Sequence, residues 1–244
     1  MAAGTTPPGA TDEAQAAKWV QRAFAEVAPK YDLLNHLLSF NIDRSWRKRI
    51  VKRLRPVLER PNARVLDLCC GTGDVLLDLQ SAAKSAIIGA DFCHPMLVAA
   101  SRKIAKKNCN SILFEGDALQ LALRNDSLDA IAIAFGFRNL TNYEGGLREL
   151  YRVLKPGGNL AIVEFSHVQG GLMRFFYGSY SRWILPLIGR AVSGSKEAYS
   201  YLPASIAKFP RAERLREMML VAGFREADYE LLTGGISALH FGTK

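Results

Sequence analysis

The chain has 244 residues, 49% of them hydrophobic, which is enough for one large α/β domain with a substantial core. Lysine and arginine outnumber the acidic residues by 32 to 23, and the net charge of +9 favours anionic partners such as lipid or nucleic acid. No apolar stretch reaches eighteen residues, so we expect no transmembrane helix, and the N-terminus lacks the pattern of a signal or transit peptide.

The cysteines indicate neither a metal site nor a disulfide framework. Cys69, Cys70, Cys93 and Cys109 lack the spacing of metal ligands, and the first two are adjacent inside a predicted strand. We interpret them as buried free thiols of a protein in the reducing cytoplasm.

The N-terminal part is predicted to be a tail followed by helices. Residues 1–11 are small and rich in turn formers, which is typical of a disordered terminus. From Asp12 to Leu38 apolar residues recur at helical spacing, and Pro29 interrupts the pattern, so we expect two helices.

A strongly basic helix is expected over residues 44–55. Such a charge run is usually a solvated face, and the alternative is contact with an anionic membrane, worth on the order of 1 kcal/mol per basic residue near the surface. Nucleic acid is not expected as a partner, because the aromatic residues form no interleaved stacking platform and no nucleic-acid-binding module is present.

Residues 65–74 have the pattern of a nucleotide-binding turn. The apolar run 65–70 is typical of a strand buried on both faces of a parallel sheet. Gly71, Thr72 and Gly73 then turn the chain into a helix that begins at Asp74. Glycine lets a ligand approach the backbone, and the start of a helix presents free N–H groups.

The identity of the nucleotide follows from what comes after this turn. Asp91 lies twenty residues after Gly71, at the end of a second apolar run, where a carboxylate can accept hydrogen bonds from ribose hydroxyls. Position 76 is Leu where a dinucleotide fingerprint has its third glycine, and no Walker lysine–serine pair is present. A nucleoside without phosphates is favoured, with S-adenosylmethionine the common example, although a different Rossmann-type ligand stays open.

Further strands are expected at 112–115, 128–135 and 159–165, with a helix over 143–154. Right-handed crossovers place the carboxyl ends of these strands at one edge of the sheet, where ligands bind. Asp117 follows the third of the five strands, and its simplest role is to cap a helix.

The last third of the chain contains an unusual insertion. No acidic residue occurs between Glu164 and Glu197, and aromatic and branched apolar residues are spaced with arginines through this stretch. A substrate-side cap with its own core is the favoured interpretation, and a surface that meets a lipid substrate is the alternative. A helix over 211–222 and a strand pair, 224–232 with 237–242, complete the expected fold.

Several motifs together resemble the ubiquinone/menaquinone biosynthesis C-methyltransferase family of class I S-adenosylmethionine-dependent enzymes. Besides the glycine turn and Asp91, the motifs lie at 31–35, 134–139, 154–158, 199–202 and 238–242, in the order that the family has. The resemblance covers roughly residues 19 to 244. It implies a Rossmann-like α/β fold, with a mostly parallel seven-stranded sheet, helices on both faces and an antiparallel last strand.

The resemblance also implies a domain organisation. After the tail, residues 12–244 would form a single methyltransferase domain, with a substrate-side insertion at 166–210. Residues 12–60 would form a helical lid over the cofactor, and a helix pair that only packs on the sheet is the alternative.

The residues expected to bind S-adenosyl-L-methionine follow from the family motifs. They are Gly71, Thr72, Gly73, Asp91, Asp117, Ala118 and Ala134. Asp117 would accept a hydrogen bond from the adenine amine, beside the backbone of Ala118. Two positions differ from many members, which have Ser at position 134 and Asn at position 117. The cofactor carries its own activated methyl group, so no metal or protein nucleophile is required.

The implied acceptor is a polyprenylated quinol, most simply demethylmenaquinol. The alternatives are 2-methoxy-6-polyprenyl-1,4-benzoquinol of ubiquinone biosynthesis and another small lipophilic acceptor. Arg138 is the expected catalytic residue, as a permanent cation that stabilises the phenolate, and a salt bridge that holds its loop is the alternative. Tyr199, Tyr201 and His240 match family positions that line the quinol pocket, although a lone histidine here is more often structural.

Three classes of function therefore stay open: a quinol C-methyltransferase, a methyltransferase with another acceptor, and a non-catalytic binding subunit. The intact Gly71, Asp91 and Arg138 argue against the last of these. Expected partners beyond the quinol are an anionic membrane at the cytoplasmic face and, without a stated preference, a homodimer or a complex of quinone-biosynthesis enzymes.

Overall fold

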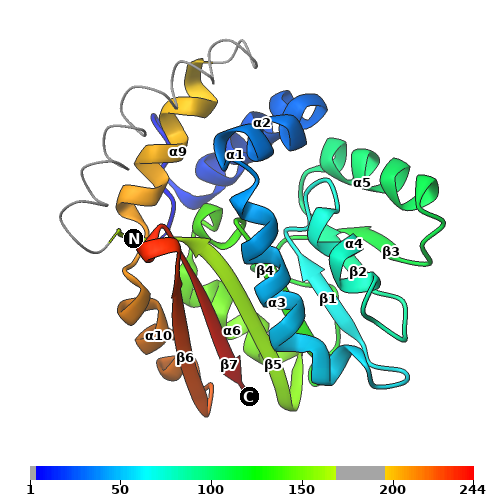
Figure 1. Ribbon diagram of the computed structural model, residues 1–244. Helices are drawn as coiled ribbons and strands as arrows, with labels where there is room; N and C mark the ends of the chain where they lie inside the picture. The colour runs from blue at the N-terminus through cyan, green and yellow to red at the C-terminus, as the bar shows by residue number, and fades with distance from the viewer. Residues whose placement is uncertain (1–3, 169–195) are drawn as a thin grey trace.

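The computed structural model describes residues 4–168 and 196–244 (Figure 1). The predicted insertion at 166–210 lies largely in the gap, so its apolar segments and its arginines are outside the described residues. At its C-terminal end, the helix α9 spans Lys196–Lys208.

A seven-stranded sheet forms the centre of the molecule, in the order β3-β2-β1-β4-β5-β7-β6. Its strands are β1 (Val65–Leu68), β2 (Ile88–Asp91), β3 (Ile112–Glu115), β4 (Leu128–Ala134), β5 (Leu154–Phe165), β6 (Glu226–Leu232) and β7 (Ser237–Thr243). β1 to β5 pair in parallel, and β7 runs antiparallel to both of its neighbours. The predicted mostly parallel sheet with an antiparallel last strand is confirmed.

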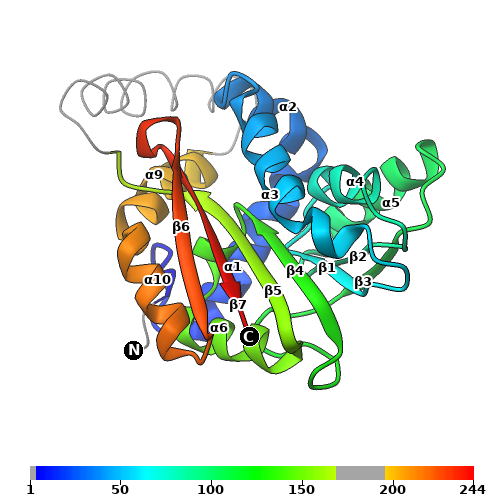
Figure 2. The same ribbon diagram turned by 60° about the horizontal axis from the view of Figure 1, so that its bottom comes forward.

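Helices cover both faces of the sheet, which explains the continuous apolar runs of its central strands (Figure 2). α3 (Ile42–Leu58) and α4 (Asp74–Gln80) pack on one face, and α6 (Tyr143–Val153) and α10 (Ala212–Val221) pack on the other. α5 (His94–Lys106) lies beside β2 and β3. Each face has its own cluster of buried apolar side chains, so the sheet is a layer between two cores.

The N-terminal helices lie over the carboxyl ends of the parallel strands (Figure 1). α1 spans Glu13–Val27, a short 3-10 turn follows at Ala28–Lys30, and α2 spans Tyr31–Leu38. The break at Pro29 is therefore confirmed. Phe24 and Tyr31 contact the first turn of α5 through Met96, in a small third core.

The chain before α1 differs from the predicted disordered tail. Residues 4–11 have a defined path, with Thr5 only 5% exposed. The Thr5 N–H donates to the Leu140 carbonyl at 2.8 Å, and its hydroxyl lies 2.7 Å from that of Tyr201. The segment is held by polar contacts to distant residues, which a search for hydrophobic periodicity does not detect.

The basic helix, α3, is paired within the fold. Its apolar stripe, which includes Trp46 and Ile50, faces the sheet. Arg53 lies 2.7 Å from Asp228, and Arg49 pairs with Glu230, both on the edge strand β6. Some of the basic residues of α3 therefore form ion pairs with acidic residues of the same domain. Within residues 4–168 and 196–244, no helix is both long and apolar enough to cross a membrane.

Candidate functional site

The glycine turn joins β1 to α4 through residues with left-handed backbone angles. The φ angles are 56° at Cys69, 53° at Gly71 and 86° at Gly73. A β-carbon on Gly73 would lie 3.2 Å from that of Ala100 in α5, so glycine at this position serves the packing of the turn against α5.

Asp91 ends β2 and fastens the turn. One carboxylate oxygen accepts from the N–H of Gly71 at 2.8 Å, and the other accepts from the N–H of Cys93 at 2.9 Å. Burial raises the pKa of Asp91, and these backbone hydrogen bonds oppose the shift. Each carboxylate oxygen can accept more than one hydrogen bond, so the group retains acceptor capacity.

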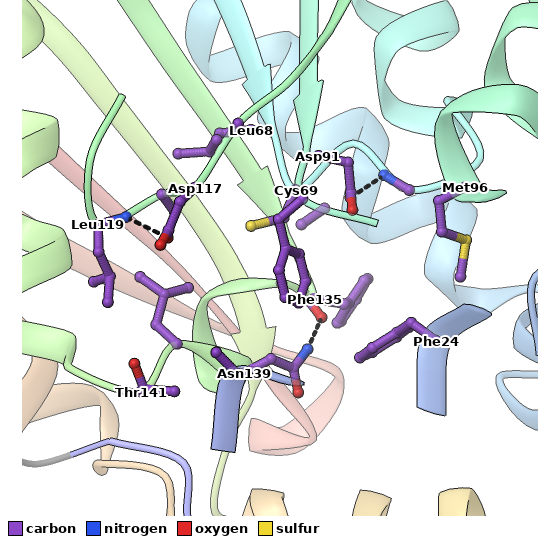
Figure 3. Close-up of a pocket in the computed structure, with 18 of the residues that line it drawn as sticks. Phe24, Leu68, Cys69, Asp91, Met96, Asp117, Leu119, Phe135, Asn139 and Thr141 are labelled. Carbon is purple, nitrogen blue, oxygen red and sulfur yellow. Dashed lines mark hydrogen bonds between the residues drawn. The ribbon is translucent and has the colours of Figure 1, made fainter. Parts of the chain in front are cut away.

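A cleft opens to solvent at this edge of the sheet, where ligands of parallel α/β folds bind. Its walls come from the ends of β1, β2 and β4, from the segment after β3, and from α1 and α2. Asp91 and Asp117 lie on either side of Cys69 and Phe135, with Phe24 and Asn139 farther from them in this view (Figure 3). The lining therefore combines two carboxylates with several aromatic side chains.

Five of the predicted cofactor residues line this cleft: Gly71, Asp91, Asp117, Ala118 and Ala134. The Asp117 carboxylate accepts from the N–H of Leu119 at 2.9 Å within a turn, and no helix follows before β4 in the described residues, so the expected helix cap is absent; its second oxygen is left for a ligand. Elements that are far apart in the sequence thus deliver these five residues to one site, as the parallel topology predicts.

Thr72 and Gly73 are not among the lining residues. Thr72 is 3% exposed, and its hydroxyl donates to Asp32 of α2 and accepts from the ammonium of Lys103, at 2.5 and 3.2 Å. The sequence suggested that all three residues of the turn contact the ligand, whereas the structure places only Gly71 against the cleft.

Arg138 lies behind the aromatic wall, 5% exposed, and does not line the cleft. Its Nη1 lies 3.2 Å from each carboxylate oxygen of Glu164 and donates to the carbonyl of Phe135. Burial by itself would lower the pKa of Arg138, but the Glu164 carboxylate together with the Tyr31 and Tyr201 side chains raises the pKa overall. This geometry matches the alternative named from the sequence, a salt bridge that holds the loop. The catalytic role of Arg138 stays a prediction.

The other expected acceptor-pocket residues have different positions. Tyr201 donates to the side-chain carbonyl of Asn139 at 3.0 Å, and Asn139 lines the cleft. His240 does not line it: the side chain is 1% exposed, and its Nε2 lies 2.9 Å from the Ala212 carbonyl of α10. Burial lowers the pKa of His240 to about 4, so the ring is neutral and structural. The side chain of Tyr199 is outside the described residues.

Sequence reasoning missed several residues of the site. Phe24, Tyr31, Phe92 and Met96 line the cleft, and Glu164 holds Arg138. Tyr31 belongs to a motif that the resemblance used, so a signal for it existed. The others look like ordinary core residues, because only the approach of α1 and α5 to the strand edge brings them into the cleft.

The chain was compared with known proteins and with solved structures. It matches the sequence model of the ubiE/COQ5 methyltransferase family over residues 11–244. It is 46% identical to a demethylmenaquinone methyltransferase of Thermus thermophilus, covering 91% of this chain and 99% of that protein. A demethylmenaquinone methyltransferase of Deinococcus radiodurans is 42% identical, with 100% of each chain covered. A ubiquinone/menaquinone biosynthesis C-methyltransferase UbiE of Geotalea daltonii is 39% identical, covering 92% and 96%.

The solved structures support the fold. A SAM-dependent methyltransferase of Thermotoga maritima, described as a possible histamine N-methyltransferase, has a TM-score of 0.60 at 20% identity, covering 91% of this chain and 99% of that one. A SAM-dependent methyltransferase of Aquifex aeolicus has a TM-score of 0.58 at 18% identity, covering 81% and 88%. With its sheet order, its cleft and these relatives, the chain belongs to the ubiE/COQ5 methyltransferase family and is a methyltransferase.

Proposed function

We propose that this enzyme transfers a methyl group from S-adenosylmethionine to a ring carbon of demethylmenaquinol. The observation that carries the proposal is the cleft, whose lining combines Gly71, Asp91 and Asp117 with aromatic side chains such as Phe24 and Phe135. The names of the relatives from Thermus thermophilus and Deinococcus radiodurans support this choice of acceptor.

The polar part of the cleft fits the cofactor. Asp91 is buried and keeps acceptor capacity for the two ribose hydroxyls, and Asp117 has an oxygen for the adenine amine. Gly71 lines the cleft without a side chain, so a ligand can approach its backbone. S-adenosylmethionine, when bound, supplies a methyl group that is already activated on a sulfonium.

The aromatic part suits a planar, apolar acceptor ring. Phe24, Tyr31 and Phe135 line it, and such walls bind an aromatic ring and exclude water. Asn139 adds an amide that can orient a ring hydroxyl. A ring carbon of the acceptor becomes nucleophilic when the quinol loses a hydroxyl proton, because negative charge then spreads into the ring.

Arg138 is our candidate for stabilising the phenolate. It lies between Phe135 and Asn139 in the sequence, and its buried Nε has no hydrogen-bond partner. Glu164 forms an ion pair with it, so the proposed effect is that of a fixed hydrogen-bond donor rather than of an isolated positive charge. We do not assign Arg138 the role of a general base, because its guanidinium remains protonated.

The experiment is a methyl-transfer assay with purified protein and labelled S-adenosylmethionine. We expect the labelled methyl group to be transferred to demethylmenaquinol, less of it to a methoxybenzoquinol, and none when the acceptor is kept oxidised. An oxidised quinone is electron-poor and has no ionisable hydroxyl, so product formed strictly without reductant would overturn the mechanism. A preference for the monocyclic quinol would move the enzyme to the ubiquinone branch.

Peripheral contact with the membrane at the cytoplasmic face is part of this proposal, because a polyprenyl tail keeps the acceptor in the bilayer. In α2, which borders the cleft, the side chain of Leu33 is 61% exposed. Ile42 at the start of α3 is 38% exposed and lies close in sequence to the exposed basic residues Arg44 and Lys48. Exposed apolar side chains beside basic side chains are typical of a surface that contacts a membrane.

A further inference from the structure

An ion network centred on Lys103 joins helix α2 to the glycine turn. The ammonium Nζ lies 2.5 Å from Oδ2 of Asp32 in α2 and 2.7 Å from Oδ1 of Asp74, the first residue of α4. It also donates to the Thr72 hydroxyl at 3.2 Å. The Thr72 hydroxyl in turn donates to the other oxygen of Asp32 at 2.5 Å. One lysine of α5 therefore ties α2 to the turn that begins α4, two parts of the chain that are distant in sequence from it and from each other.

The network also fixes a wall of the cleft. Tyr31 precedes Asp32 in the chain and lines the cleft, 3.7 Å from where a β-carbon on Gly71 would be. The ring of Tyr31 meets that of Phe24 edge to face, with centroids 6.1 Å apart. A movement of Asp32 away from Thr72 would therefore move Tyr31 away from Gly71 and open the cleft on the side of α2.

The electrostatics of the network make Lys103 its critical member. The side chains of Asp32, Lys103 and Asp74 are 35%, 27% and 28% exposed, so the charges are only partly screened by solvent. Asp32 and Asp74 both lie against this ammonium, and Arg47 pairs with Asp74 as well, at 3.7 Å. Without Lys103, the carboxylate of α2 would face the carboxylate of α4 across Thr72, and the repulsion would favour an open α2.

We propose that Asp32 and Lys103 are positioning residues that latch α2 over the cleft and thereby limit the rate at which S-adenosylmethionine leaves. This inference rests on the proposed cofactor and extends it, because it names the groups that hold the cleft closed. The latch is ionic, so its strength falls with ionic strength. An apolar lid would show the opposite dependence or none.

The test compares Asp32→Asn, Lys103→Met and the double variant with a matched control, Lys106→Met. Lys106 is an exposed lysine of the same helix, outside the network. The probe is labelled S-adenosylmethionine, and the measurement is its dissociation rate after rapid dilution. We expect each single variant to release the probe about two- to fivefold faster, as for a partly exposed ion pair. The double variant should be no faster than Lys103→Met, and the control should match the wild type.

Salt provides a readout that a general loss of stability would not give. Raising NaCl from about 0.05 to about 0.5 M should speed release from the wild type and from Lys106→Met, and should change it less in Asp32→Asn. Equal salt dependence in these three proteins, or unchanged dissociation in both single variants, would overturn the proposal.

Amide hydrogen exchange without any ligand separates this inference from the proposed function. Residues 31–38 should exchange faster in Asp32→Asn than in the wild type, with no change in the α6 and α10 segments. If the wild-type protein binds no S-adenosylmethionine, the proposed function fails while this exchange experiment still reports on the latch. Unchanged exchange at 31–38 in Asp32→Asn would refute the latch itself.

Discussion

Replacing Glu164 by alanine should destabilise the protein by about 3–5 kcal/mol, because it leaves a buried guanidinium without its counter-ion. The Glu164 side chain is completely buried, and that of Arg138 is 6% exposed. Besides Nη1 of Arg138 at 3.2 Å, the carboxylate accepts from the backbone N–H groups of Arg138 and Phe165, both at 3.0 Å. The substitution therefore removes one charge and the partner of three buried donors.

Two further variants test the reasoning behind that magnitude. Glu164→Gln keeps the size and one acceptor oxygen, enough for one of the two backbone N–H groups, but loses the charge, so its cost should be smaller than that of alanine, about 1–3 kcal/mol. Replacing both partners, with Glu164→Leu and Arg138→Met together, removes the unpaired charge and should cost less than the sum of the two single changes.

The assay is equilibrium unfolding in urea, with the free energy extrapolated to water and the slope compared between variants. An unchanged slope with a lower midpoint is the expected pattern. If Glu164→Ala lies within about 1 kcal/mol of the wild type, the pair is not the buried, desolvated contact described here. If the double change costs as much as both single changes added, the two side chains are not energetically coupled.

Four other outcomes are expected. Asp91→Ala should weaken S-adenosylmethionine binding by about 1.5–3 kcal/mol in calorimetric titration, whereas Asp117→Asn, which keeps an acceptor, should bind nearly as well as the wild type. Arg138→Lys should retain cofactor affinity and lose most turnover if the guanidinium acts on the acceptor; turnover at the wild-type rate would make Arg138 purely structural. His240 has a folded pKa of about 4 against an ordinary 6.5, so the unfolded chain binds the extra proton and stability should fall as pH drops from about 6.5 towards 4. Urea titrations of His240→Gln should show that this component, about 3 kcal/mol in total, has gone. Anionic liposomes should bind the protein reversibly and release it in salt, and co-sedimentation that ignores both lipid charge and salt would contradict the membrane proposal.

The order of strands and helices could be predicted from the sequence because it follows from local patterns of apolar residues, proline and glycine. Continuous apolar runs gave the central strands, Pro29 divided the first helical segment, and glycines marked the turn after β1. Asp91 and Asp117 were placed in one site because parallel strands deliver their carboxyl ends to the same edge. These inferences need only periodicity and a topological rule.

The roles of individual side chains depended on which distant elements pack together. Thr72 was expected to contact the ligand, but its hydroxyl bonds to Asp32 and Lys103, 40 and 31 residues away. His240 was a candidate for the acceptor pocket with a structural role as the more usual interpretation, and only the fold decided between them: its position on β7 points it at α10, where burial keeps it neutral.

The tertiary structure alone also decided the surroundings of Arg138. The sequence identified a cation at the edge of the sheet, whereas the partner that compensates its charge, Glu164, comes from the neighbouring strand β5 and has no local signature. Hydrophobic periodicity fixes which face of an element is buried, but the pairing of polar groups depends on distances of a few ångströms between elements. Those distances arise only when the two cores on either side of the sheet have packed.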